Sequence, residues 1–148
     1  GVIMSRSVST RVTTVSETET AAFGRATAEL LSSGDVLLIS GPLGAGKTAF
    51  VRGLAEGLGA DPSEVSSPTF ALVQSYGGRL PLTHADLYRI TPAEVEELAL
   101  EEMAPDGVLA VEWPDRWHRA PAQAWHITIA DAGGDERTIE RSRDYSTR

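Results

Sequence analysis

The sequence of 148 residues contains no cysteine and no asparagine, and Lys47 is the one lysine among its 13 lysine and arginine residues. Without cysteine, thiolate metal sites and cysteine nucleophiles are excluded, and this composition fits a reducing compartment. The longest apolar runs, residues 36–39 and 108–111, are far shorter than the roughly 20 residues that span a bilayer, and no apolar signal-peptide region stands near the N-terminus. We therefore expect a cytoplasmic protein with no membrane association.

Basic residues are also scarce relative to acidic ones, which leaves a net charge of −8. A broad nucleic-acid surface needs clustered lysine and arginine to neutralise phosphates, so this balance argues against direct binding of nucleic acid. Any role near RNA is expected to depend on a protein partner. Because every other basic residue is arginine, Lys47 marks a position that needs a compact ammonium on a flexible stem.

The pattern of apolar residues predicts one α/β domain with a mixed central sheet flanked by helices. Continuous apolar runs at residues 36–40 and 108–111 are typical of strands buried in a parallel sheet. Residues 70–76 and 80–88 flank Gly77-Gly78 and predict an antiparallel hairpin. Further strands are expected at residues 10–15, 124–130 and 137–141, and helices at 17–32, at 47–58 and from Pro92. The domain would span residues 10–141, between a flexible N-terminal segment, 1–9, and a C-terminal tail, 142–148.

A glycine-rich motif directly follows the first buried run. The pattern G-x-x-x-x-G-K-[ST] is filled by Gly41, Gly46, Lys47 and Thr48. Glycines let successive backbone amides turn toward an anion, and the helix that follows points its N-terminal dipole at the same anion. The lysine reaches the β- and γ-phosphates, and the hydroxyl ligates Mg²⁺. We therefore predict a P-loop NTPase, whose other nucleotide contacts would come from Gly44, Ala45 and Ala49.

Nucleotide hydrolysis also needs a group that holds the metal and one that orients or activates water. Glu112 ends the buried run 108–111, the place of a Walker-B acid, although a solvated acid at a strand end is the alternative. Asp86 shares a strand face with His84 and Tyr88 and is a candidate for metal or water chemistry, or else part of a hydrogen-bonded polar face. Thr69 is a candidate γ-phosphate sensor, and an ordinary turn is equally consistent with its surroundings.

The missing asparagine bears on the choice of nucleotide. The usual guanine-reading element is Asn-Lys-x-Asp, and this chain has no asparagine and a single lysine in the P-loop. We therefore expect ATP rather than GTP.

Four motifs together give a more specific indication than the P-loop alone. Residues 41–48, 67–70, 84–89 and 111–114 stand in the order and at similar spacing to those of the TsaE (YjeE) family, which the chain resembles from about residue 16 to 137. This family contains the bacterial ATPase for tRNA threonylcarbamoyladenosine formation. The resemblance implies a compact P-loop domain that binds ATP and Mg²⁺, hydrolyses ATP slowly alone and acts with TsaB and TsaD. TsaD carries the transferase site, so tRNA would be met only indirectly.

The resemblance also implies roles for individual residues. Thr48 and Glu112 would hold Mg²⁺, with Asp86 as the third candidate metal ligand, and Lys47, Asp86 and Glu112 would serve turnover. Thr69 would match a switch threonine. By matching position, the start of the first helix at Ser16 and the basic residue Arg137 are candidates for the purine site, and Trp113 matches the tryptophan after the acid or is a packing residue.

Two positions depart from the family pattern. Pro42 stands where the family usually has aspartate, and Ala49 where a second threonine is common. Neither position supplies a phosphate or metal ligand in the mechanism above.

Two other function classes stay open. A small-molecule P-loop kinase would need a lid with arginines, for which residues 115–119 are the one candidate. A nucleotide-gated interaction module would need binding but no turnover.

Overall fold

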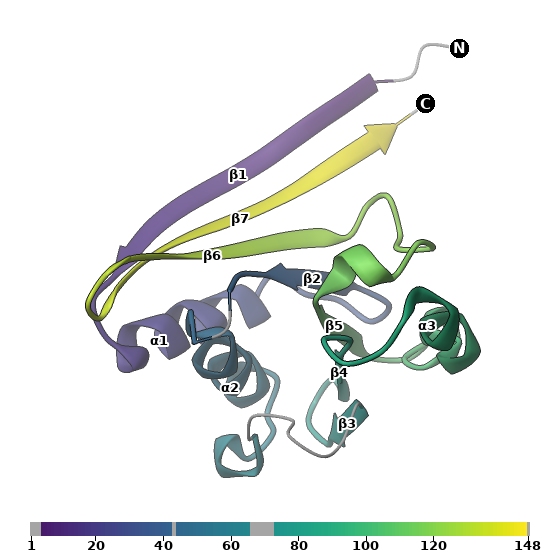
Figure 1. Ribbon diagram of the computed structural model, residues 1–148, viewed down its shortest axis with the longest axis horizontal. Helices are drawn as coiled ribbons and strands as arrows, with labels where there is room; N and C mark the ends of the chain where they lie inside the picture. The colour runs from purple at the N-terminus through teal and green to yellow at the C-terminus, as the bar shows by residue number, and fades with distance from the viewer. Residues whose placement is uncertain (1–3, 43, 66–72, 148) are drawn as a thin grey trace.

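The computed structural model describes residues 4–42, 44–65 and 73–147. Within them, one seven-stranded sheet has the order β1-β7-β6-β2-β5-β4-β3 (Figure 1). The strands are β1 (Met4–Thr14), β2 (Val36–Ser40), β3 (Val73–Tyr76), β4 (Leu82–Asp86), β5 (Val108–Glu112), β6 (Trp125–Gly133) and β7 (Glu136–Thr147). The α-helices are α1 (Glu17–Ala28), α2 (Lys47–Gly57) and α3 (Pro92–Leu98), and single 3₁₀ turns are η1 (Pro62–Glu64), η2 (Leu100–Glu102) and η3 (Pro114–Arg116). No helix among these has the length and apolar character needed to cross a membrane.

The centre of the sheet is parallel, as the two continuous apolar runs predict. Strand β2 pairs in parallel with both β5 and β6, and β4 pairs in parallel with β5. All five residues of β5 are buried, since helices cover both faces of the sheet there. Parallel strands end at one edge, so the segments after β2, β4 and β5 emerge side by side.

The predicted hairpin is confirmed in its described part. Strands β3 and β4 are antiparallel, with Tyr76 opposite Leu82 across the Gly77-Gly78 connection. Antiparallel pairs also complete the other side of the sheet, where β7 lies between β6 and β1. The sheet is therefore mixed, with a parallel core and antiparallel margins.

The two strands at the β1 edge are longer than the sequence predicts. Their register pairs Met4 with Thr147, and Figure 1 shows both running past the rest of the sheet. The expectation of flexible ends at 1–9 and 142–148 is therefore wrong for residues 4–9 and 142–147. These stretches have little apolar alternation, and the backbone ladder is supplemented by polar cross-strand pairs such as Ser7–Asp144, at 2.6 Å.

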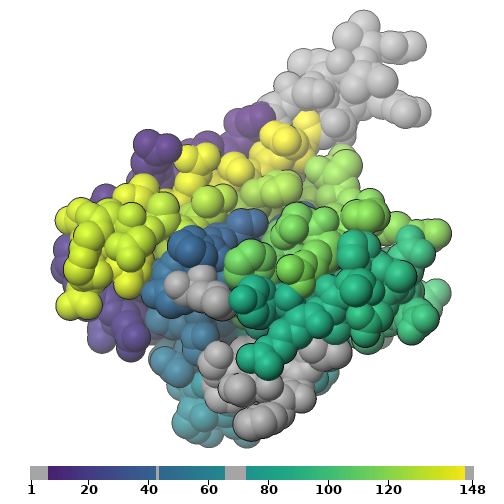
Figure 2. All heavy atoms as spheres, in the orientation of Figure 1, coloured from purple at the N-terminus to yellow at the C-terminus, as the bar shows by residue number. Residues whose placement is uncertain are grey.

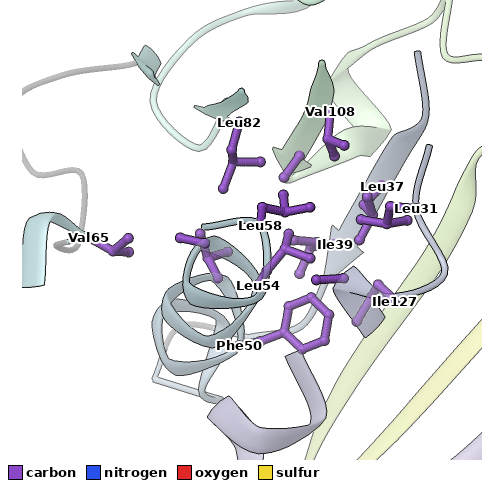
Figure 3. Close-up of a cluster of buried hydrophobic side chains, with 14 of the residues drawn as sticks. Leu31, Leu37, Ile39, Phe50, Leu54, Leu58, Val65, Leu82, Val108 and Ile127 are labelled. Atoms are coloured by element: carbon purple, nitrogen blue, oxygen red, sulfur yellow. The ribbon is translucent and has the colours of Figure 1, made fainter. Parts of the chain in front are cut away.

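Buried side chains form one cluster on each face of the sheet, as the alternation of strand residues requires. Leu37 and Ile39 of β2 face α1 and α2, where Phe50 and Leu54 are fully buried (Figure 3). Leu38 faces the opposite way, into the cluster under α3. The larger cluster thus fixes α2 against the parallel strands, and with it the loop that precedes α2.

Helices α1 and α2 approach closely at three glycines. A Cβ on Gly53 would lie 1.8 Å from the carbonyl oxygen of Ala21, and one on Gly24 would lie 2.2 Å from that of Phe50. A Cβ on Gly57 would lie 2.8 Å from the carbonyl oxygen of Arg25. Both Gly53 and Gly57 therefore face α1, and a side chain at either position would push the two helices apart.

Substitution of Gly53 tests this helix contact. Alanine has the higher helix propensity by roughly 1 kcal/mol, yet we expect Gly53→Ala to lower the free energy of unfolding by about 1–3 kcal/mol, because its methyl group meets backbone. Gly77→Ala is the matched control: nothing lies within 4 Å of its added Cβ, and we expect a change within about 0.5 kcal/mol. Urea unfolding measures both. A Gly53→Ala protein as stable as the parent would contradict the close approach.

Candidate functional site

The glycine-rich loop connects β2 to α2 at the carboxyl edge of the sheet. Gly44 and Gly46 have φ angles of +78° and +101°, a region that side chains with a Cβ rarely adopt. Gly41 is required for another reason, since a Cβ there would lie 2.5 Å from the carbonyl oxygen of Ile129 in β6. The motif glycines therefore serve the loop conformation and its packing on the sheet.

The loop leads into a helix N-terminus with free amide groups. Gly46 is the N-cap of α2, and no described side chain caps that end. Uncapped amides and the helix dipole together favour an anion at this point. Figure 2 shows the loop at the surface, between the β6–β7 turn and the segments after β4 and β5.

Lys47, at the start of α2, is only 6% exposed and lies between the loop and an aromatic ring. Its Nζ donates to the carbonyl oxygen of Gly41 at 2.6 Å and lies 4.3 Å from the ring centroid of Trp113. Trp113 has a left-handed backbone conformation, with a φ of +58°, and its ring packs against that of Tyr88 with 4.9 Å between centroids and a tilt of 41°. Trp113 is thus a contact of the P-loop lysine and more than a packing residue.

Two carboxylates lie beside each other on the adjacent strands. Asp86 is opposite Glu112 in the parallel register of β4 and β5, so both side chains lie on the face that α2 covers. Asp86 accepts a hydrogen bond from the Tyr88 amide at 2.9 Å. Glu112 is buried and makes a 2.6 Å hydrogen bond to Nε2 of His84. Glu112 is therefore a buried, partnered acid, which excludes the solvated strand end considered from sequence.

The pKa values of the site's charged groups shift in opposite directions. Burial lowers the pKa of the Lys47 ammonium, while the nearby carboxylates of Glu112 and Asp86 oppose that shift. Burial also raises the pKa of Asp86, and the hydrogen bond from the Tyr88 amide opposes the rise. Each shift disfavours the charged form, so these groups are placed where charge is costly without a ligand.

A cavity of about 340 Å³ connects these groups. This volume falls in the range of small-ligand sites. Its described lining comprises Ser16, Glu17, Thr20, Gly44, Gly46, Lys47, Thr48, Ala49, Arg52, Asp86, Glu112, Trp113, Asp135 and Arg137. Most of the residues singled out from sequence are thus brought to one place. Gly41 and Ala45 belong to the loop itself without lining the cavity, and Thr69 lies outside the described residues.

Arg137, a candidate for the purine site, donates hydrogen bonds to backbone carbonyl oxygens of the P-loop and of the β6–β7 turn. Its Nε donates to the carbonyl oxygen of Ala45 at 3.1 Å, and its Nη2 to that of Gly44 at 3.4 Å. Nη1 donates to the carbonyl oxygens of Gly134 and Glu136 in the β6–β7 turn. These bonds tie the outer side of the P-loop to the turn. Whether Arg137 also meets a purine remains a prediction.

Sequence reasoning missed several residues of the site. Thr20, Arg52 and Asp135 line the cavity, and the bond between His84 and Glu112 joins residues 28 positions apart. Helical spacing offers a signal for Thr20 and Arg52, which lie one turn beyond Ser16 and Thr48. The contacts of His84 and Asp135 depend on strand pairing and on the β6–β7 turn, which have no local sequence signature.

Comparison with known proteins identifies a family. The sequence model described as "Threonylcarbamoyl adenosine biosynthesis protein TsaE" matches residues 14–139. The tRNA threonylcarbamoyladenosine biosynthesis protein TsaE of Bacillus subtilis (strain 168) is 45% identical over 129 residues, which cover 85% of this chain and 80% of that protein. The Synechocystis protein of the same name is 46% identical over 107 residues, 68% of each chain. The crystal structure of "Bacillus subtilus YdiB" has a TM-score of 0.71 and 36% identity, covering 95% of this chain and 87% of that one. The fold expected from sequence is confirmed.

The raised pKa of Asp86 predicts how its replacement affects stability. Folded Asp86 holds its proton more tightly than the unfolded chain does, so ionised Asp86 destabilises the fold at neutral pH. This penalty disappears at low pH, where both states are protonated. We expect Asp86→Asn to raise the Tm near pH 7.5, measured in EDTA without nucleotide, and the gain to shrink as the pH falls toward the ordinary carboxyl value of about 3.9.

Asp106→Asn is the control, because Asp106 is an exposed turn residue and its replacement should leave the Tm nearly unchanged. A lower Tm for Asp86→Asn at neutral pH would show that Asp86 stabilises the free protein, contrary to this account.

Proposed function

This chain belongs to the TsaE family, whose proteins serve tRNA threonylcarbamoyladenosine biosynthesis, and we propose that within that pathway it binds and hydrolyses ATP with Mg²⁺ and acts with TsaB and TsaD. One observation carries the proposal: the P-loop, Lys47 and the Asp86–Glu112 pair line a single cavity. A binding loop alone would account for affinity. The two carboxylates beside it supply what hydrolysis needs in addition.

The donor atoms of the cavity fit a magnesium ion. Thr48 offers a hydroxyl, and Asp86 and Glu112 offer carboxylate oxygens, the hard donors that Mg²⁺ prefers. No group of three or more acidic, histidine or cysteine side chains forms a metal cluster in the described part of the chain. A small protein donor set suits Mg²⁺, which commonly keeps several waters and takes ligands from substrate phosphates.

The charges of the cavity also favour a metal-bound nucleotide. Its lining has four acidic side chains, Glu17, Asp86, Glu112 and Asp135, against three basic ones, Lys47, Arg52 and Arg137. A bare triphosphate would be repelled by the acidic side chains. A divalent cation bound with the phosphates would neutralise that charge and polarise the transferring phosphoryl group.

Different groups of the chain would then bind the phosphates, stabilise the transition state and position the metal and the water. The loop amides and the N-terminus of α2 bind phosphate oxygens. Lys47 exchanges its bond to the Gly41 carbonyl for the β- and γ-phosphates, where its charge stabilises the transition state. Asp86 and Glu112, on neighbouring strands, hold the metal and orient the attacking water.

The kinase alternative is weakened by the contacts of its candidate lid. Arg116 donates to the carbonyl oxygens of Leu87, Tyr88 and Ile90, which fix it to the segment after β4. A lid arginine must instead reach the transferred phosphate on closure. The interaction module remains the second candidate, and it differs from the ATPase in needing no turnover.

Paired substitutions test whether nucleotide is hydrolysed or merely bound. We expect Lys47→Ala to weaken ATP binding by about 10- to 100-fold, since a charge-assisted bond is worth roughly 1.5–3 kcal/mol, and to abolish hydrolysis. Glu112→Gln keeps the shape of the side chain, so we expect binding within about threefold and turnover reduced by roughly 100-fold. Fluorescent-nucleotide titration and release of free phosphate, each with and without TsaB and TsaD, measure the two quantities.

Arg119→Ala is the matched control for loss of a cation, because Arg119 is exposed and lies in the candidate lid. ATP hydrolysis at the parental rate in Arg119→Ala would also count against the small-molecule kinase alternative. Full hydrolysis in Lys47→Ala would refute the proposed mechanism, and tRNA modification that survives Glu112→Gln would favour the interaction module.

A further inference from the structure

His84 forms a buried contact with Glu112 that the mechanism above does not use. It lies in β4 two residues before Asp86, on the same face of the strand. Its Nε2 is 2.6 Å from Oε2 of Glu112, and the two side chains are only 1% and 5% exposed. A bond this short between buried groups fixes the position of one carboxylate oxygen.

The other ring nitrogen indicates which way this bond runs. Nδ1 of His84 is buried and has no hydrogen-bond partner among the described residues. Buried N–H groups without an acceptor are rarer in proteins than under-used acceptor atoms, so a proton on Nδ1 is disfavoured. The tautomer that fits carries its proton on Nε2, and His84 donates to Glu112.

Each of the two carboxylates of the site has one oxygen held by a hydrogen bond, and the donor differs between them. Asp86 has one oxygen bonded to the Tyr88 amide, a backbone group that lies two residues further along the chain. Glu112 has a longer side chain with one more rotatable bond, and one of its oxygens is bonded to His84. In each case one oxygen is hydrogen-bonded, and among the described residues no hydrogen bond is found for the second.

We propose that His84 is a positioning residue for the acid of the site: its Nε2–H holds Oε2 of Glu112 so that Oε1 is presented to the metal and water. This inference rests on the proposed ATP hydrolysis. A histidine that binds a metal is commonly oriented by a hydrogen bond to a carboxylate that does not touch the metal. Here the roles are exchanged: the carboxylate would bind the metal, and the histidine would orient it. Loss of such an outer contact typically costs about 10- to 100-fold in metal affinity or activity.

Two substitutions separate this role from simple packing. His84→Leu fills a similar volume without a donor, whereas the amide nitrogen of His84→Gln can reach the place of Nε2 and donate to Glu112. We expect His84→Leu to lower kcat by about 10- to 100-fold with a small change in KM, and His84→Gln to recover most of that loss. A contribution to packing alone would be restored better by leucine than by glutamine.

Affinity for a fluorescent ADP analogue provides a readout independent of turnover. We expect His84→Leu to bind the analogue like the parent in EDTA and to lose part of the gain in affinity that Mg²⁺ gives the parent, but no more of it than Glu112→Gln loses. In a Glu112→Gln background the same leucine substitution should have little further effect on kcat, because the group that it positions is already changed.

The outcomes distinguish this inference from the function on which it rests. A parent protein without magnesium-dependent ATP hydrolysis, alone or with TsaB and TsaD, would refute the proposed function. A parent that hydrolyses ATP, with a His84→Leu variant of equal kcat and equal response to Mg²⁺, would overturn the role of His84 alone. Equal defects in His84→Leu and His84→Gln would also overturn it, since the donor would then be irrelevant.

Discussion

The parallel pairing of β2, β5 and β4 is the constraint on which the site depends. Its register places Ile39 opposite Glu112, and Glu112 opposite Asp86, so the P-loop and both acids meet at one edge of the sheet. Side chains alternate along a strand, and a shift of one residue would turn Glu112 to the face under α3. Buried apolar residues on both faces of β5 oppose such a shift. The core of the protein thus determines the geometry of its chemistry.

The groups assembled in this way are held at some cost to the fold. Burial lowers the pKa of Lys47 and raises that of Asp86, so the surroundings of both side chains disfavour the charged form. Lys47 meets the Gly41 carbonyl and the ring of Trp113, partners that a phosphate chain would outcompete. A ligand that neutralises these buried charges removes their unfavourable desolvation, and this gain adds to the free energy of ligand binding. Arg137 holds the outer side of the loop through the carbonyl oxygens of Ala45 and Gly44.

The sequence predicts those parts of the fold that depend on local patterns. Continuous apolar runs identify β2 and β5, the glycine motif identifies the loop, and Gly77-Gly78 identifies the hairpin of β3 and β4. Spacing alone does not reveal partners that are distant in the chain. The direction in which Gly53 faces depends on how α1 crosses α2, and the long pairing of β1 with β7 depends on a ladder of serine- and arginine-rich strands without apolar alternation.

The same limit applies inside the site. The motif positions and the two acids could be identified because their residue types report their chemistry. The contact of His84 with Glu112 could not be identified, because His84 on a strand face is compatible with many partners until the register of β4 and β5 is known. The bonds of Arg137 to the loop's backbone could not be identified either, because they depend on where the β6–β7 turn lies, and its purine contact stays a prediction.

Complementation tests the central claim most directly. A bacterial strain depleted of its own TsaE family member would express this chain or its Lys47→Ala variant, and threonylcarbamoyladenosine in tRNA would be measured by mass spectrometry. The account predicts that the parent chain restores the modified adenosine and that Lys47→Ala, produced at an equal level, does not. Restoration by Lys47→Ala to the parental level would contradict the claim that nucleotide chemistry at this P-loop is what the chain contributes.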